Sequence, residues 1–161
     1  MRIRAFEAGV TAVALVALAL PGQPAMRQLD PWFGTWTLNM SKSSERAESV
    51  YKRVTSRIEP WLDGIRVSYD MVGIRGGVTH TEWTGKFDGK DYPMQGLDYI
   101  MTNAYRRIDD HSYEIVIKIE GTVTATAHVS VSPDGKTLNV ATDQRSADGK
   151  VSKTTAVYEK Q

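Results

Sequence analysis

The chain has 161 residues, of which 41% are hydrophobic and 24% are charged. This length suits a single domain, and the apolar content is too high for a disordered chain. The formal net charge is +1. Proteins that bind nucleic acids or anionic membranes typically carry an excess of basic residues, so we expect no nucleic-acid partner. Cysteine is absent, which excludes disulfides, thiolate nucleophiles and thiolate metal sites.

The first residues have the pattern of a signal peptide. Arg2 and Arg4 supply the positive charge, an apolar run covers 10–20, and a segment with two prolines ends it. The run is too short to span a bilayer comfortably, which takes about 20 residues. We therefore expect a signal peptide over 1–25, export to the periplasm or the exterior, and no stable membrane span after cleavage. An uncleaved N-terminal anchor is the alternative. The folded domain is expected over 26–161.

Turn signals recur along this domain, about 12–14 residues apart with one longer gap. They are Asp63-Gly64, Gly76-Gly77, Asp88-Gly89, Asp109-Asp110, Gly121, Asp134-Gly135 and Asp148-Gly149. Asp-Gly and Gly-Gly supply the positive φ angles of tight hairpins, and short runs between such turns are typical of all-β sandwiches and barrels.

Between the turns, apolar and polar residues alternate with a period of two, which predicts strands with one buried face. The expected strands lie near 33–39, 51–61, 65–73, 77–87, 97–108, 111–120, 122–132, 136–144 and 151–159, with a short one near 90–94 left open. The polar segment 41–49 is expected to be a loop, or else a lid over one end. Short connections favour a meander, and closing it removes exposed edges. The predicted fold is all-β, a single antiparallel up-and-down barrel of about 8–10 strands; a sandwich is the alternative.

A family resemblance starts at the first strand of the domain. Gly34 and Trp36 form a Gly-x-Trp that resembles the first-strand signature of the lipocalins. Segment 34–43 resembles the start of secreted bacterial lipocalin-like domains, and 134–138 and 157–161 resemble their endings. The resemblance implies a calycin-type barrel, like that of lipocalins or fatty-acid-binding proteins, whose interior is a candidate pocket. It assigns Gly34 and Trp36 a structural role.

The lipocalin resemblance also implies a basic residue near the last strand that covers the tryptophan. Arg145 and Lys153 are both candidates for it, and the sequence does not choose between them.

The alternation assigns a mostly apolar set of side chains to the barrel interior: Tyr69, Met71, Met101, Tyr105, Tyr113, Ile115 and Ile117. Apolar walls with a few phenol groups suit a hydrophobic ligand that carries one or two polar groups. We take as ligand-binding candidates Tyr69, Met71, Met101, Tyr105 and Tyr113. The alternative is that these side chains simply fill the barrel.

Catalytic motifs are not evident. The sequence has neither a Gly-x-Ser-x-Gly elbow nor a His-Glu-x-x-His zinc helix. His80 and Glu82 share one face of a strand and could reach one metal or proton, but they lie on the surface if Trp83 faces the core. We therefore expect no enzymatic activity, no cofactor and no metal, with an enzyme that uses His80 and Glu82 as a remote alternative.

These observations favour an exported small-molecule binding protein that holds a small, mostly apolar ligand inside a β-barrel. The alternative is a non-catalytic structural or protein-interaction module of the periplasm or extracellular space, with a filled barrel core. An interior too small for a ligand would favour the alternative. An exposed apolar patch formed by Trp32, Phe33 or Trp61 would favour it as well.

Overall fold

The computed structural model describes residues 30–44 and 50–161; the predicted signal peptide lies outside them. The described chain forms ten strands and one 3₁₀ helix: β1 (Gly34–Leu38), η1 (Met40–Lys42), β2 (Tyr51–Trp61), β3 (Gly64–Gly73), β4 (Val78–Gly85), β5 (Tyr92–Gln95), β6 (Met101–Arg107), β7 (Ser112–Ile119), β8 (Thr122–Val131), β9 (Thr137–Arg145) and β10 (Val151–Lys160). Within this part of the chain, no helix has the length and apolar character that a membrane crossing needs.

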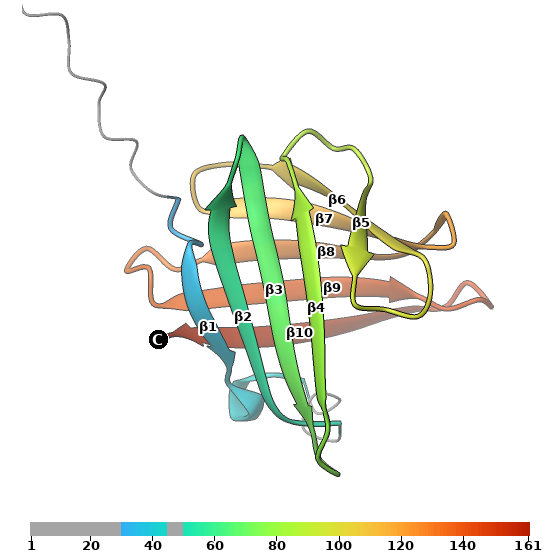
Figure 1. The fold of residues 1–161 in the computed structure, drawn as a ribbon, viewed down its shortest axis with the longest axis horizontal. Coiled ribbons are helices and arrows are strands. Elements are labelled where there is room, and N and C mark those ends of the chain that lie inside the picture. The colour runs from blue at the N-terminus through green and yellow to red at the C-terminus, as the bar shows by residue number, and fades with distance from the viewer. Residues whose placement is uncertain (1–29, 45–49) are drawn as a thin grey trace, which may run out of the picture.

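The strands form one closed antiparallel barrel, in which each strand pairs with its neighbours in the sequence. β1 closes the ring, because Trp36 lies opposite Ser56 on β2 and opposite Lys160 on β10. In Figure 1, β2, β3 and β4 cross in front of β7–β10. This confirms the predicted up-and-down barrel of lipocalin or fatty-acid-binding-protein type, at the upper end of the predicted strand count.

Two details differ from the expected strands. The short strand near 90–94 is present as β5, which pairs with β4 and β6. The strand expected over 97–108 begins only at Met101, because a loop follows Gly96. Gly96 has φ +83°, and a Cβ there would lie 2.3 Å from the carbonyl oxygen of His80. Only glycine therefore lets the end of β5 come so close to β4.

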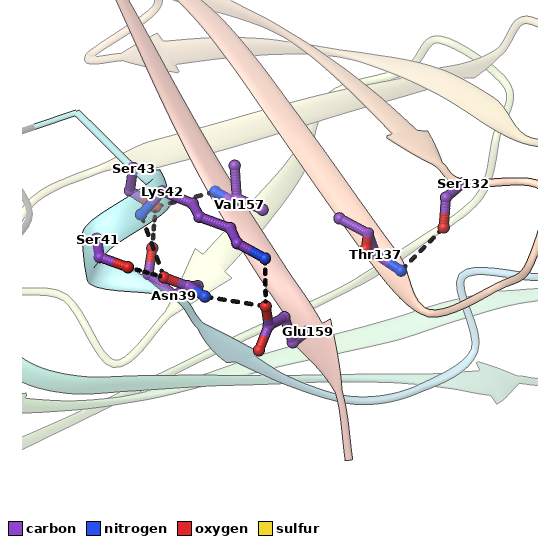
Figure 2. A network of polar contacts seen from close by, with 8 residues as sticks. All are labelled: Asn39, Ser41, Lys42, Ser43, Ser132, Thr137, Val157 and Glu159. Atoms are coloured by element: carbon purple, nitrogen blue, oxygen red, sulfur yellow. Dashed lines mark hydrogen bonds and ion pairs between the residues drawn. The ribbon is translucent and has the colours of Figure 1, made fainter.

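Polar contacts fasten the segment after β1 to β10, as Figure 2 shows. The Asn39 side chain accepts a hydrogen bond from the Lys42 backbone N–H at 3.1 Å and donates one to Glu159 at 2.9 Å. Lys42 forms an ion pair with Glu159 at 2.9 Å, and the Ser43 hydroxyl accepts from the Val157 N–H at 3.0 Å. The segment expected to be a loop thus opens with η1, anchored beside the barrel; 45–49 lie outside the described residues.

The barrel has two unlike ends. The closed end carries residues 30–33 and the turns before β3, β7 and β9, and the open end carries the turns before β4, β8 and β10. Towards the closed end, buried aromatic rings fill the interior: Trp32, Trp36, Trp83, Tyr105 and Tyr113, with Phe87 packed against them. The Trp36 indole N–H donates to the Trp32 carbonyl at 2.8 Å. This end is a packed core.

Candidate ligand-binding cavity

The open half of the barrel encloses a cavity of about 580 Å³. Its apolar lining comprises Leu38, Val54, Met71, Met94, Leu97, Met101, Ile115, Ile117, Ala127, Val140 and Ala156, and its tyrosines are Tyr51, Tyr69, Tyr99, Tyr105 and Tyr158. The remaining lining residues are neutral and polar: Thr79, Thr81, Asn103, Thr142 and Gln144. Cavities of about 300–1,000 Å³ with mostly apolar walls and a few polar groups are typical of small-molecule sites.

The cavity arises because one wall is built from short side chains. Ala127 on β8, Val140 and Thr142 on β9, and Ala156 on β10 all line it, and none of these side chains is long enough to reach far across the barrel. The same strands also contribute the longer side chains of Gln144 and Tyr158. The void therefore lies beside the short side chains of this wall.

Aromatic stacking forms the floor of the cavity. The ring of Tyr105 lies 3.8 Å from that of Trp83, nearly parallel to it, and 5.5 Å from that of Tyr113. Tyr105 is only 1% exposed. Trp83 and Tyr113 both pack against Tyr105. This stack of rings separates the cavity from the closed end.

The structure brings four of the five candidate residues to the cavity: Tyr69, Met71, Met101 and Tyr105. Tyr113 is not among the lining residues. It lies opposite Arg107 near the closed end, and its ring packs against Trp32 at 5.2 Å and Phe87 at 5.4 Å. The alternation correctly placed Tyr113 inside the barrel, but it carries no information on depth.

Sequence reasoning missed every polar member of the lining except Tyr69 and Tyr105, and Asn103 and Tyr158 are two examples. The signal was present, because Asn103 lies between Met101 and Tyr105 at the same period of two, and Tyr158 follows Ala156 in the same way. Their polar character concealed them, since the search for interior positions looked for apolar runs.

Three of the cavity phenols, those of Tyr69, Tyr105 and Tyr158, have a raised pKa. Burial raises the pKa of Tyr69, although a hydrogen bond with Ser56 partly offsets this. Burial, and then the neighbouring phenol of Tyr69, raises the pKa of Tyr105 and of Tyr158. The phenols thus stay neutral at physiological pH and can donate hydrogen bonds.

Asn103 is the most isolated polar group of the lining. It is 3% exposed, and its side-chain oxygen has no hydrogen-bond partner among the described residues. Buried polar atoms are nearly always paired in folded proteins, and this oxygen, which water cannot reach, is an exception.

The mouth of the cavity is rich in apolar side chains. The turns and strand ends around it expose Val50, Ile74, Val78, Tyr99, Ile100, Val123 and Val151. Such a rim suits the passage of an apolar molecule.

His80 and Glu82 lie on the outer face of β4, because Thr79, Thr81 and Trp83 point inward. His80 Nδ1 lies 2.7 Å from Asp70 Oδ1, and Glu82 lies 3.6 Å from Arg66 Nε. Both are side-chain contacts between the neighbouring strands β3 and β4 on the outer face. In the described ranges, no group of three or more His, Cys, Asp or Glu side chains is placed to hold a metal ion.

A basic residue does cover Trp36, but it is neither of the two candidates. Lys160 Nζ lies 5.0 Å from the centre of the Trp36 ring, because β10 continues to the closed end, where Lys160 is paired with Trp36. Arg145 is paired with Val151, and Lys153 with Asp143, towards the open end. Both candidates are therefore wrong. Arg107 covers Trp32 in a similar way, 4.9 Å from its ring.

Two comparisons with known proteins found no match. No protein-family model matches the sequence, and no curated protein matches it significantly. The lipocalin resemblance therefore stays a prediction, based on the residues around Gly34 and Trp36.

Proposed function

We propose that this protein is a non-catalytic binding protein that holds a small, mostly apolar molecule in the open half of its barrel. The observation that carries the proposal is the cavity of about 580 Å³ above a closed aromatic floor. The alternative of a structural module requires a filled core, and only the closed half is filled. Of the residues named for an exposed apolar patch, Trp32 is fully buried and Phe33 is half-buried, whereas Trp61 is 41% exposed next to the exposed Leu62; this small patch is the one observation that favours the structural alternative.

The physical basis is the hydrophobic effect. Each Å² of apolar ligand surface removed from water contributes about 25 cal/mol, and most of the lining is aliphatic or aromatic. The threonines and phenols add a few hydrogen-bonding positions that orient the ligand. A largely apolar site of this kind, open at one end, is suited to carrying or sensing a molecule that water dissolves poorly.

Export and kinship with secreted bacterial lipocalin-like proteins belong to the same proposal. The support for export is the charged and apolar pattern of the first 25 residues, and the support for kinship is Gly34 with Trp36 on the first strand of a barrel. Expression of the full chain in a bacterium, followed by fractionation and mass measurement, tests export. A shortened protein in the periplasm or medium is expected; full-length protein in the cytoplasm would contradict it.

Titration with the neutral fluorescent probe N-phenyl-1-naphthylamine tests binding. Ala156 lines the cavity and faces across the barrel, so Ala156→Phe fills part of the space. Ala141 on the neighbouring strand β9 lies between the lining residues Val140 and Thr142 and is exposed on the outer face. Ala141→Phe is therefore a matched control. We expect the wild type and the control to bind the probe, and Ala156→Phe to bind at least tenfold more weakly.

Thermal unfolding of each variant shows whether the fold is retained. Failure of the wild-type protein to bind any apolar probe would overturn the proposal. Equal binding by Ala156→Phe and the wild type would place the probe outside the cavity and would also count against it.

A further inference from the structure

We propose that the open end of the barrel docks on the surface of a phospholipid bilayer, with the cavity mouth facing the lipid, so that an apolar ligand passes directly between bilayer and cavity. The passage of a ligand rests on the proposed binding function. The docking itself is supported by the side chains that the open end exposes.

The apolar surface of the molecule is concentrated at this end. The described residues expose ten large apolar side chains, and seven of them belong to the turns and strand ends around the mouth. The most exposed of the seven are Val78, at 70%, and Ile100, at 69%. Single apolar residues on a surface are ordinary, whereas a group of them around one end of a molecule indicates an interaction site.

These side chains lie on both sides of the mouth. On one side, the Ile74 N–H donates to the Val50 carbonyl at 3.1 Å, which joins the start of β2 to the turn before β4. On the other side, the Glu120 N–H donates to the Ile100 carbonyl at 3.0 Å, which holds Ile100 beside the turn before β8. Tyr99 is 46% exposed and also lines the cavity. At Tyr99 the exposed apolar surface therefore continues into the cavity.

The charges around the mouth favour a lipid surface as the partner. Five exposed basic side chains at this end form no ion pair with another described residue: Lys52, Arg53, Arg75, Arg145 and Lys150. The acidic side chains at this end without an ion pair to another described residue are fewer: Asp98, Glu120 and Asp148. Towards the closed end, in contrast, five basic side chains are paired with acidic ones: Arg57, Arg66, Lys86, Arg106 and Arg107. The net charge of the chain is only +1, so the attraction to anionic headgroups is local to the open end.

A bilayer accommodates both features at once. Apolar side chains leave water at the boundary of the acyl chains, while Lys and Arg stay at the level of the headgroup phosphates. Tyrosine is enriched at this boundary because its ring is apolar and its hydroxyl is polar, which suits Tyr99. A second copy of this chain is a less favourable partner, because two such ends would bring their unpaired basic side chains together.

Vesicle flotation tests the docking without any ligand. The vesicles contain phosphatidylcholine and phosphatidylglycerol in equal parts, and the proteins are recovered as in the export test, so that all share one N-terminus. The double variant Val78→Glu, Ile100→Glu places a charge on each side of the mouth. We expect the wild type to bind the vesicles and the double variant to bind about tenfold more weakly.

Leu62→Glu is the matched control, because Leu62 is 92% exposed in the turn before β3 at the closed end. It is expected to bind like the wild type. A second double variant, Arg75→Gln with Lys150→Gln, changes only exposed side chains and should bind about fivefold more weakly for each charge removed. Thermal unfolding of each variant checks the fold.

Three results would overturn the docking and leave the proposed binding function intact. These are a wild type that does not bind vesicles, a glutamate double variant that binds as well as the wild type, and a loss of binding in Leu62→Glu alone. Self-association of the wild type that is lost in the double variant, without vesicle binding, would identify a second copy as the partner instead.

Probe transfer tests the passage of a ligand. Protein loaded with N-phenyl-1-naphthylamine is mixed with vesicles that carry a fluorescence quencher. Transfer on contact predicts a rate that rises with vesicle concentration and is slower for the glutamate double variant. A rate independent of vesicle concentration would show release through water and overturn direct passage. If the protein does not take up the probe at all, the proposed binding function fails, while flotation still decides the docking.

Discussion

The two halves of the barrel share ten strands and one alternating pattern, yet only one half is filled. Near the closed end, large rings such as Trp36, Trp83 and Tyr113 meet across the interior, and Trp32 enters from the segment before β1. Near the open end, Thr142 and Ala156 face the same axis and leave a cavity. The backbone architecture sets where the interior lies, and the size of the inward side chains contributes to which part of it is open.

The halves differ in charge as well as in size. At the closed end, Arg107 and Lys160 lie over buried tryptophans, and Arg107 also forms an ion pair with Asp30 at 2.6 Å. Among the described residues, the cavity lining includes no charged side chain. We infer that the closed half supplies most of the stability, and that the open half is free to recognise a ligand.

The sharpest test of this division compares truncations in the two halves. Trp36→Ala removes a buried ring and its hydrogen bond to Trp32, and we expect it to lower the free energy of unfolding by about 3–5 kcal/mol. Met101→Ala removes a side chain that already borders a void, so the loss should be closer to about 1 kcal/mol. Urea unfolding measures both. Similar losses would mean that the open half contributes as much to stability as the closed half.

The next test uses alkaline pH. Burial raises the pKa of Tyr69, Tyr105, Tyr113 and Tyr158 above their ordinary value of 10. Above pH 10 these phenols ionise in the unfolded chain but not in the folded barrel, so stability is fully present below pH 10 and falls as the pH rises further. Each such tyrosine adds up to about 1.4 kcal/mol per pH unit to the slope.

Tyr105→Phe should therefore reduce the alkaline slope by about the contribution of one tyrosine, measured by urea unfolding between pH 8 and pH 11. Ile115→Val changes the same region without altering a titratable group, so its slope should equal that of the wild type. An unchanged slope in Tyr105→Phe would show that the floor of the cavity is open to water.

Much of the fold could be predicted from the sequence because its signals are local. Asp-Gly pairs at 63–64 and 134–135 lie at hairpin turns, and the two-residue alternation of β3 and β8 assigns their buried faces. Both depend on neighbouring residues only. The sequence also indicated a short strand near 90–94, where β5 lies, although the four residues of β5 are too few to establish an alternation.

The site could be predicted less well, because depth along the barrel depends on contacts between distant strands. Tyr113 and Tyr69 look alike in the alternation, but pairing with Arg107 places Tyr113 near the closed end. The residue over Trp36 depends likewise on the length of β10 and its register with β1. The lipocalin resemblance implied a basic residue that covers Trp36. Only the pairing of β1 with β10 in the closed barrel shows that this residue is Lys160.

That finding leads to a smaller test at the closed end. Lys160→Met removes a cation over the Trp36 ring and a hydrogen bond to the Pro31 carbonyl at 3.3 Å. We expect a loss of about 0.5–1 kcal/mol in the free energy of unfolding, as for cation–π contacts at exposed sites. Arg145→Met, at the open end, is the matched control and should have little effect. If both variants behave alike, the covering cation has no role in stability.

The smallest effect is expected on the outer face of β4. His80 and Asp70 are both 57% exposed, and Glu82 faces Arg66 beside them. Exposed ion pairs contribute about 0–1 kcal/mol, so the double variant His80→Ala, Glu82→Ala should change stability by less than about 1 kcal/mol. Probe affinity and metal content should not change, because Thr79 and Thr81 are the residues of this strand that line the cavity. Weaker probe binding or a loss of bound metal in the double variant would show that the outer face takes part in function, and the assignment of recognition to the cavity alone would fail.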